Sequence, residues 1–206
     1  MTRIGVLALQ GDFAAHARVL RGLGADVVDV RHVARLAGLD GLVIPGGEST
    51  TLLNLMADEP WFPALREFHE SGGAILGTCA GAILLASEVT GPSQPSLGLL
   101  DATIARNGFG RQVDSFETTL DAPALGGAVQ AVFIRAPRFA RLGPHVDTLA
   151  VYDREAVLVR EGRVLAATFH PELTPDAELH AYFLGMVQGS ETTVASGARA
   201  PAGRFL

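Results

Sequence analysis

The first half of the chain alternates short apolar runs with segments whose apolar residues recur at helical spacing. Residues 4–9 are continuously apolar, which is typical of a strand buried on both faces of a sheet. Further strands are predicted at residues 25–30, 42–44 and 74–78. Helices are predicted between them at residues 12–23, after Ser49, at 62–70 and at 80–88. This alternation predicts a mainly parallel sheet with helices on both faces.

The second half is richer in strands than the first. Strands are predicted at residues 102–106, 115–120, 129–135, 148–152, 156–160 and 164–169, with a hairpin turn at 160–163. Thr174 as N-cap and Pro175 at the first helical position predict a last helix that reaches about Val187. We therefore expect an α/β domain at residues 1–188, with three layers around an open, mixed sheet. A mobile tail is expected at residues 189–206.

Composition and charge limit the functional classes. The 206 residues carry a net charge of −6, which argues against nucleic-acid binding, because that needs a basic face. All 16 basic residues are Arg, so no lysine is available for a Schiff base or a phosphate-binding loop. No apolar run reaches the roughly 18 residues of a membrane-spanning helix. A single Cys excludes an intrachain disulfide and a multi-thiolate metal site, and it favours a reducing, cytoplasmic location.

The single cysteine lies in the sequence Gly77-Thr78-Cys79-Ala80-Gly81, between a predicted strand and a predicted helix. This is the form of a nucleophile elbow, a sharp, strained turn that holds a nucleophile between small residues. The N-terminus of the following helix favours a thiolate at Cys79. The backbone N–H of Ala80 is well placed to donate to an oxyanion. A buried structural cysteine is the alternative, but the two glycines favour a catalytic one.

A thiolate nucleophile needs a base, and the base needs a group that orients it. His170 ends an apolar strand, and strand ends are where ligands bind in open α/β sheets. Glu172 follows two residues later, so in an extended segment its side chain points the same way as that of His170. Cys79, His170 and Glu172 are therefore predicted to form a catalytic triad. The alternative is a turn histidine beside a surface glutamate.

The remaining histidines offer weaker candidates for the base. His16, His69 and His180 fall in predicted helices, where a packed or solvated histidine is expected. His32 and His145 fall in connections between elements, and the sequence leaves their role open. None of the five ends a buried strand as His170 does.

A glycine-rich segment, Pro45-Gly46-Gly47-Glu48-Ser49, follows the predicted strand at 42–44. Two glycines after a buried strand allow backbone N–H groups to face a bound oxyanion. On its own the segment also fits an ordinary strand-to-helix turn capped by Ser49. The serine is not a second elbow nucleophile, because the position two residues after it is not a glycine.

The segments around Cys79 and His170 resemble the triad of class I (Triad) glutamine amidotransferases, a resemblance that implies a flavodoxin-like fold. Further segments narrow it to the family of glutaminase subunits of pyridoxal 5'-phosphate synthase. These segments are residues 7–11, 45–51, 106–112, 133–137 and 169–174. The first two of these blocks and the elbow suit several glutaminases, and the blocks that begin at Arg106 and Phe133 are the ones that discriminate among them.

The resemblance implies a role for each site residue. Cys79 attacks the side-chain amide carbon of glutamine, His170 transfers protons, and Glu172 orients His170. Oxyanion contacts are implied at Gly47 and Ala80, with Gln10 joining them once a partner is bound. Glutamine contacts are implied for Gly47, Glu48, Ser49, Arg106, Ile134 and Arg135, where a guanidinium suits the substrate α-carboxylate.

The implied reaction is the hydrolysis of L-glutamine to L-glutamate and ammonia through a glutamyl thioester, without a metal or organic cofactor. The implied partner is the synthase (lyase) subunit, which uses the ammonia to build pyridoxal 5'-phosphate. Two other interpretations stay open from the residues alone. One is a cysteine hydrolase of another substrate on a similar scaffold, against which the segment 45–51, Arg106 and Arg135 argue. The other is a non-catalytic binding module, against which the intact triad argues.

Overall fold

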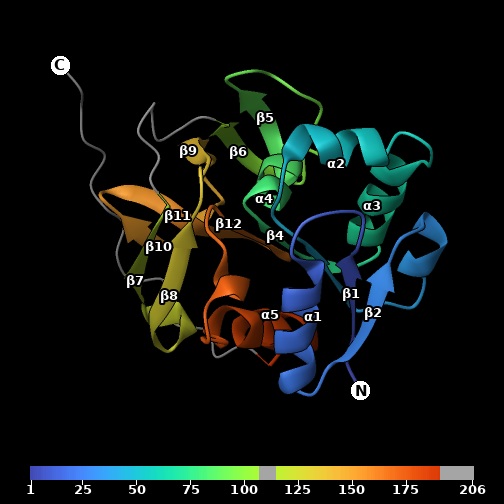
Figure 1. The fold of residues 1–206 in the computed structure, drawn as a ribbon, viewed down its shortest axis with the longest axis horizontal. Coiled ribbons are helices and arrows are strands. Elements are labelled where there is room, and N and C mark those ends of the chain that lie inside the picture. The colour runs from blue at the N-terminus through green and yellow to red at the C-terminus, as the bar shows by residue number, and fades with distance from the viewer. Residues whose placement is uncertain (107–114, 191–206) are drawn as a thin grey trace.

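A seven-stranded sheet forms the centre of the computed structural model, which describes residues 1–106 and 115–190. Its strand order is β10-β11-β12-β4-β3-β1-β2 (Figure 1). The parallel part consists of β1 (Arg3–Leu7), β2 (Asp26–Val30), β3 (Gly41–Ile44), β4 (Ala74–Thr78) and β12 (Val164–Ala167). Two antiparallel strands, β10 (Asp147–Tyr152) and β11 (Glu155–Glu161), extend the sheet at one side. The predicted mixed, mainly parallel sheet is confirmed.

Helices cover both faces of this sheet (Figure 1). One face carries α1 (Phe13–Gly22) and α5 (Glu178–Gln188), and the other carries α2 (Ser49–Leu55), α3 (Trp61–Glu70) and α4 (Ala80–Leu85). Each face has its own apolar core, because successive strand residues point to opposite sides. Ile4 packs with Leu20 and Phe183 on the first face, whereas Leu42 packs with Leu65 on the second. The three-layer arrangement predicted from the sequence is therefore present.

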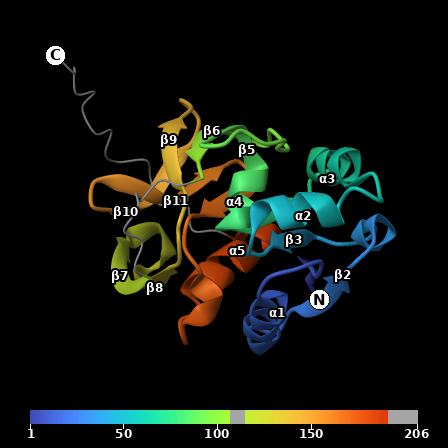
Figure 2. The ribbon, with the colours of Figure 1, turned by 45° about the horizontal axis from the view of Figure 1, so that its top comes forward.

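Two smaller sheets flank the centre. The three-stranded one contains β5 (Ala86–Thr90), β6 (Leu100–Ala105) and β9 (Arg138–Leu142). The hairpin of β7 (Phe116–Ala122) and β8 (Gly127–Phe133) joins the apolar core of the α1 and α5 face (Figure 2). Short 3-10 helices occur at η1 (Val33–Leu36), η2 (Pro123–Leu125) and η3 (Pro171–Leu173). The predicted hairpin turn after β11 is confirmed, since β11 and β12 pair as antiparallel neighbours.

The helix predicted at 80–88 is shorter than expected. It ends at Leu85, and the chain continues as β5, which pairs in parallel with β6. The hydroxyl of Ser87 donates to the carbonyl of Ala102, a contact that tertiary pairing supplies and a local pattern does not show. The sequence patterns predicted neither β5 nor β9, the strand on the other side of β6. Most residues of β9 are exposed, so the strand has no apolar run that would reveal it.

The last helix begins later than Thr174 and Pro175 predict. Thr174 does not cap α5: its hydroxyl donates to the carbonyl of Pro171 and accepts from the N–H of Asp176. The carboxylate of Asp176 instead accepts from the N–H of Glu178, the first residue of the helix. The intervening residues therefore belong to the turn that follows His170, and the helix starts only after that turn.

Two expected segments fall largely outside the described residues. Of the tail expected at 189–206, only Gly189 and Ser190 are described, and of the block at 106–112 only Arg106. Gly189, at φ 66, ends α5 in the left-handed conformation that glycine adopts readily. No helix in the described ranges is both long and apolar enough to cross a membrane.

Candidate active site

The predicted site residues meet at one edge of the central sheet. Because β1, β3, β4 and β12 are mutually parallel, their carboxyl ends share an edge, and Gln10, Gly46, Cys79 and His170 follow them there. The approach is close: a Cβ built on Gly46 would lie 2.4 Å from Cε1 of His170 and 3.2 Å from Cβ of Cys79. The glycine loop after β3 is therefore packed directly on the cysteine and the histidine.

Cys79 occupies the strained turn that the sequence predicts. Its φ of 48° and ψ of −103° are unusual for a residue with a side chain, and its N–H donates to the carbonyl of Ala167 at 2.8 Å. A Cβ on Gly81 would lie 2.0 Å from the carbonyl oxygen of Ile44, and one on Gly77 would lie 2.6 Å from the carbonyl carbon of Gly81. The turn between β4 and α4 has no room for side chains at these two positions, as a nucleophile elbow requires.

His170 and Glu172 form a buried pair beside this cysteine. Nδ1 of His170 lies 2.8 Å from Oε1 of Glu172, and the N–H of His170 donates to the carbonyl of Val132 at 2.8 Å. Burial by itself lowers the pKa of His170, but hydrogen bonds with Cys79 and Glu172 and the charges of both raise it to about 10. At neutral pH the imidazole is thus held protonated, between a carboxylate on Nδ1 and the sulfur of Cys79.

The predicted oxyanion residues also lie at this edge. Ala80 begins α4, directly after Cys79. The side chain of Gln10 lies against Gly47, where an added Cβ would be 2.4 Å from Oε1, and this oxygen accepts from the N–H of Glu48 at 3.2 Å. Gly11, at φ 78°, packs so closely that a Cβ there would lie 1.9 Å from the carbonyl oxygen of Gly46. The loops after β1 and β3 therefore form one contiguous wall.

Two of the predicted glutamine contacts are paired with each other. Glu48 is the N-cap of α2 and accepts from the N–H of Thr51 at 2.7 Å and from the hydroxyl of Thr50. These hydrogen bonds, the one from Thr50 first, lower the pKa of Glu48 to about 2. Nη2 of Arg106 lies 3.2 Å from Oε1 of Glu48. A carboxylate and a guanidinium thus stand side by side at the rim of the site.

The remaining predicted contacts lie around the same edge. Ser49 is buried, and its hydroxyl donates to Oε1 of Gln94 at 2.8 Å, a contact for which the sequence offers no signal. Ile134 and Arg135 directly follow β8, which is bridged to His170 through Val132. Arg135 is exposed and has a φ of 44°. All site residues predicted from the sequence are therefore described, and none is placed away from this edge.

Two buried histidines behind the triad were missed as site residues. Nε2 of His16, on α1, lies 3.2 Å from Oε2 of Glu172 and 3.3 Å from the hydroxyl oxygen of Thr78. Nδ1 of His16 lies 2.8 Å from Nε2 of His180, on α5. The sequence placed both in predicted helices and left open whether they are packed or solvated, since a helical pattern alone does not separate a site residue from an ordinary core residue. A buried polar residue on the inward face of a helix is the signal that points to a partner.

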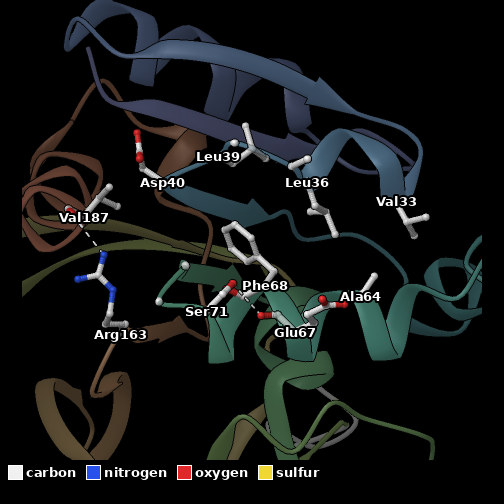
Figure 3. A pocket seen from close by; sticks show the side chains of 14 residues that line it. Val33, Leu36, Leu39, Asp40, Ala64, Glu67, Phe68, Ser71, Arg163 and Val187 are labelled. Atoms are coloured by element: carbon white, nitrogen blue, oxygen red, sulfur yellow. Dashed lines mark hydrogen bonds between the residues drawn. The ribbon is translucent and has the colours of Figure 1, made fainter.

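A cavity of about 480 Å³ lies at the opposite edge of the sheet (Figure 3). Its lining includes Asp40, which precedes β3, Gly73, which precedes β4, and Arg163, which precedes β12. The guanidinium of Arg163 donates to the carbonyls of Met186 and Val187 at the end of α5. The cavity thus opens at the amino ends of the strands, and it shares no residue with the site around Cys79.

Comparison with known proteins shows the family to which the chain is related. Residues 6–189 match the model of the SNO glutamine amidotransferase family. A relative from Deinococcus radiodurans, named pyridoxal 5'-phosphate synthase subunit PdxT, is 54% identical over 188 residues, which cover 89% of this chain and 96% of the relative. A relative of the same name from Niallia circulans is 48% identical over 186 residues, covering 90% and 98%.

Solved structures show the same architecture. A crystal structure of a glutamine amidotransferase superposes with a TM-score of 0.85 at 51% identity, over 90% of this chain and 98% of the other. PurLQS from Thermotoga maritima has a TM-score of 0.70 at 17% identity, over 89% and 98%. The latter likeness concerns the fold alone.

The buried His180 predicts a loss of stability in mild acid. Burial lowers its pKa from 6.5 to about 4, although the charge of Asp176 acts in the opposite direction. As pH falls through 6.5 the unfolded chain takes up a proton that the folded chain refuses until about pH 4, so stability present above 6.5 is lost over this interval. The loss attributable to His180 is about 3 kcal/mol. Urea unfolding at pH 7.5 and 4.5 should show it.

The variant His180→Gln isolates this effect, because glutamine keeps an amide donor but does not titrate. We expect a smaller loss of unfolding free energy between the two pH values than in the unchanged chain. The exposed His145→Gln is the matched control and should keep the full loss. Equal losses in all three proteins would contradict the assignment to His180.

Proposed function

The chain belongs to the SNO glutamine amidotransferase family, and from this premise we propose that it is the glutaminase subunit of a pyridoxal 5'-phosphate synthase. It hydrolyses L-glutamine to L-glutamate and ammonia and passes the ammonia to a synthase subunit. The observation that carries the proposal is the strained Cys79 beside a buried His170–Glu172 pair, at the sheet edge where the glycine loop of β3 arrives.

The chemistry follows from the protonation of this pair. The sulfur of Cys79 attacks the side-chain amide carbon of glutamine and forms a tetrahedral intermediate with a negatively charged oxygen. Protonated His170 gives its proton to the departing nitrogen, so that ammonia leaves and a glutamyl thioester remains. Neutral His170 then takes a proton from water, whose oxygen attacks the thioester and releases glutamate. Glu172 holds Nδ1 of His170 throughout and stabilises the imidazolium.

Backbone and charged groups around the elbow support the remaining roles. The N–H of Ala80, at the start of α4, and that of Gly47 donate to the oxyanion, and Gln10 contributes when the partner is bound. Glutamine carries both an α-carboxylate and an α-ammonium group. The guanidinium of Arg106 and the carboxylate of Glu48, which are paired with each other, are complementary in charge to these two groups. Arg135, which follows β8, supplies a second guanidinium for the α-carboxylate. Ser49 and Ile134 complete the contacts of the substrate.

The composition of the chain supports a division of labour with a partner. Without lysine, the chain has no amine side chain to hold pyridoxal phosphate or a sugar phosphate as an imine. Ammonia is mostly protonated near neutral pH, where it is a poor nucleophile, so direct delivery to the synthase subunit preserves its reactivity. The free thiol of Cys79 fits a reducing, cytoplasmic location.

Replacement of the nucleophile is the first test. Cys79→Ala should abolish glutamine hydrolysis, because no other side chain at the elbow can form the thioester. A glutamine-analogue electrophile should add one covalent label to the unchanged chain, at Cys79, and none to the variant. Mass spectrometry and ammonia release measure the two effects, and circular dichroism checks the fold. Turnover near that of the unchanged chain in the variant would contradict the proposal.

Replacement of His170 and replacement of Glu172 should lower turnover to different extents. His170→Asn should lower turnover about as far as Cys79→Ala does, because members of a triad act as a unit. Glu172→Gln should cost less, since Glu172 orients the base without transferring the proton itself. Steady-state rates of ammonia release separate the two cases. Full activity in Glu172→Gln would show that another group orients His170.

Coupling to the synthase subunit is the third test. The isolated chain should hydrolyse glutamine poorly, and addition of the partner should raise the rate, because the loop of Gln10 and Gly11 completes the oxyanion contacts on binding. One oxyanion donor is typically worth ~10²–10³ in rate. Titration of Cys79→Ala with the synthase subunit provides the control for complex formation. An unchanged rate in a complex that demonstrably forms would contradict the coupling and leave the glutaminase assignment standing.

A further inference from the structure

The carboxylate of Glu172 faces different groups on its two sides. Oε1 lies 2.8 Å from Nδ1 of His170, and the imidazole of His170 also interacts with Cys79. Oε2 faces His16, whose Nε2 lies 3.2 Å away. The side chains of His16 and Glu172 are completely buried. The proposed mechanism uses Oε1 and leaves the contact on Oε2 without a role.

His16 lies between three other polar groups. Its Nδ1 lies 2.8 Å from Nε2 of His180, and its Nε2 lies between the hydroxyl oxygen of Thr78 at 3.3 Å and Oε2 of Glu172. The contact with Thr78 is aligned as a hydrogen bond, whereas that with Glu172 is within ion-pair distance without such alignment. The polar hydrogen on Nε2 would then be shared between a hydroxyl and a carboxylate.

The proton positions among these groups follow from the carboxylate. A neutral imidazole has one N–H and one acceptor nitrogen. If Nε2 of His16 were the acceptor, its lone pair would face the negative oxygen of Glu172 in a buried environment, which is repulsive. With the proton on Nε2, His16 donates toward Glu172, and its Nδ1 accepts from the Nε2–H of His180. The hydrogen bond from His180 thereby fixes the tautomer of His16.

We propose that His16 is a positioning residue for the catalytic carboxylate, and that His180 holds His16 in the tautomer required for this role. The Nε2–H of His16 keeps Oε2 of Glu172 in place, so that Oε1 stays on His170. This role rests on the proposed glutaminase function. The effect of His16 on Glu172 and His170 is nevertheless expected for any substrate, because it does not involve a substrate contact.

The neutrality of His16 is part of the argument. Burial, and after it the neighbouring His180 and His170, lower the pKa of His16 well below 6.5. A neutral donor orients the carboxylate without neutralising it. A charged His16 would instead compete with His170 for the negative charge of Glu172. The positive charge therefore stays on His170, next to the sulfur where it is used.

The fold explains why these residues meet. Helices α1 and α5 pack side by side on the same face of the sheet (Figure 1), and they bring His16 and His180 together from opposite ends of the chain. Thr78 ends β4 directly before Cys79, and η3, which contains Glu172, contacts α1. The support behind the triad is thus built from rigid elements.

Two variants of matched polarity test the proposal. In His16→Gln the amide nitrogen reaches the position of Nε2 and can still donate to Glu172. In His16→Asn the shorter amide reaches only the position of Nδ1. We expect kcat for glutamine to fall roughly 10–100-fold in His16→Asn with KM little changed, and to stay close to that of the unchanged chain in His16→Gln. His69→Asn, at the other edge of the sheet, is the control and should retain full kcat.

A second readout does not need glutamine hydrolysis. Because the chain has one Cys, iodoacetamide reports the reactivity of Cys79 alone. A poorly held Glu172 stabilises the imidazolium of His170 less, so in His16→Asn the acid limb of the alkylation profile should move to higher pH by roughly one unit. His16→Gln should keep the profile of the unchanged chain.

The outcomes separate this inference from the proposed function. Equal kcat and equal alkylation profiles in His16→Asn and the unchanged chain would overturn the inference, as would equal losses in the Asn and Gln variants. If the unchanged chain hydrolyses no glutamine even in complex with the synthase subunit, the proposed function fails, and the alkylation profiles alone decide the inference. If His16→Asn does not fold, the variants His180→Leu and His180→Gln are compared instead, with His16 itself unchanged. We expect His180→Leu, which cannot donate to Nδ1 of His16, to lower kcat, and His180→Gln, which can, to retain it.

Discussion

The close approach of Gly46 to the ring of His170 is the contact on which the arrangement of the site depends. There is no room for even a methyl group at this glycine, since a Cβ would lie 2.4 Å from the ring. The same loop then carries Gly47 and Glu48 toward the elbow, and the elbow itself closes on Ile44 through Gly81. One dense packing contact between β3, β4 and the end of β12 therefore sets the distances among Cys79, His170 and the proposed oxyanion donor at Gly47.

The three buried histidines of the site differ in the direction of their pKa shifts. Against the effect of burial, the neighbouring Cys79 and Glu172 raise the pKa of His170 to about 10. On the other side of Glu172, burial keeps His16 and His180 neutral. An isolated buried carboxylate is unfavourable, and Glu172 is stabilised by its hydrogen bond with Nδ1 of His170, while the neutral His16 lies 3.2 Å from its other oxygen. The site thus concentrates its positive charge at the imidazole that contacts the nucleophile.

Sequence patterns predicted the parts of the molecule in which local and global preferences agree. The buried parallel strands and the elbow around Cys79 followed from apolar runs and glycine spacing. The contact of His170 with Glu172 was predicted from an extended segment and is present, but the segment is not extended: Glu172 lies in the 3-10 helix η3. The strand β5 and the late start of α5 were not predicted, because pairing with β6 and the turn after His170 override local signals there. His16 and His180 are 164 positions apart, so only the packing of α1 on α5 reveals their contact.

The two halves of the site differ in exposure, and this difference bears on how a partner acts. The reacting groups are buried, with Cys79 7% and Glu172 5% exposed, whereas the side chain of Glu48 is 51% exposed and Arg135 is exposed. Charge interactions between exposed groups are weakened by water and screened by salt, while those of buried groups are not. A protein surface that covers the rim would remove water from Glu48, whose partner Arg106 is only 15% exposed, and would strengthen the interaction of this pair with a bound amino acid. Covering the rim would add little at the already buried Cys79, so we expect the proposed partner to act chiefly on substrate binding and on the proposed oxyanion contact at Gln10.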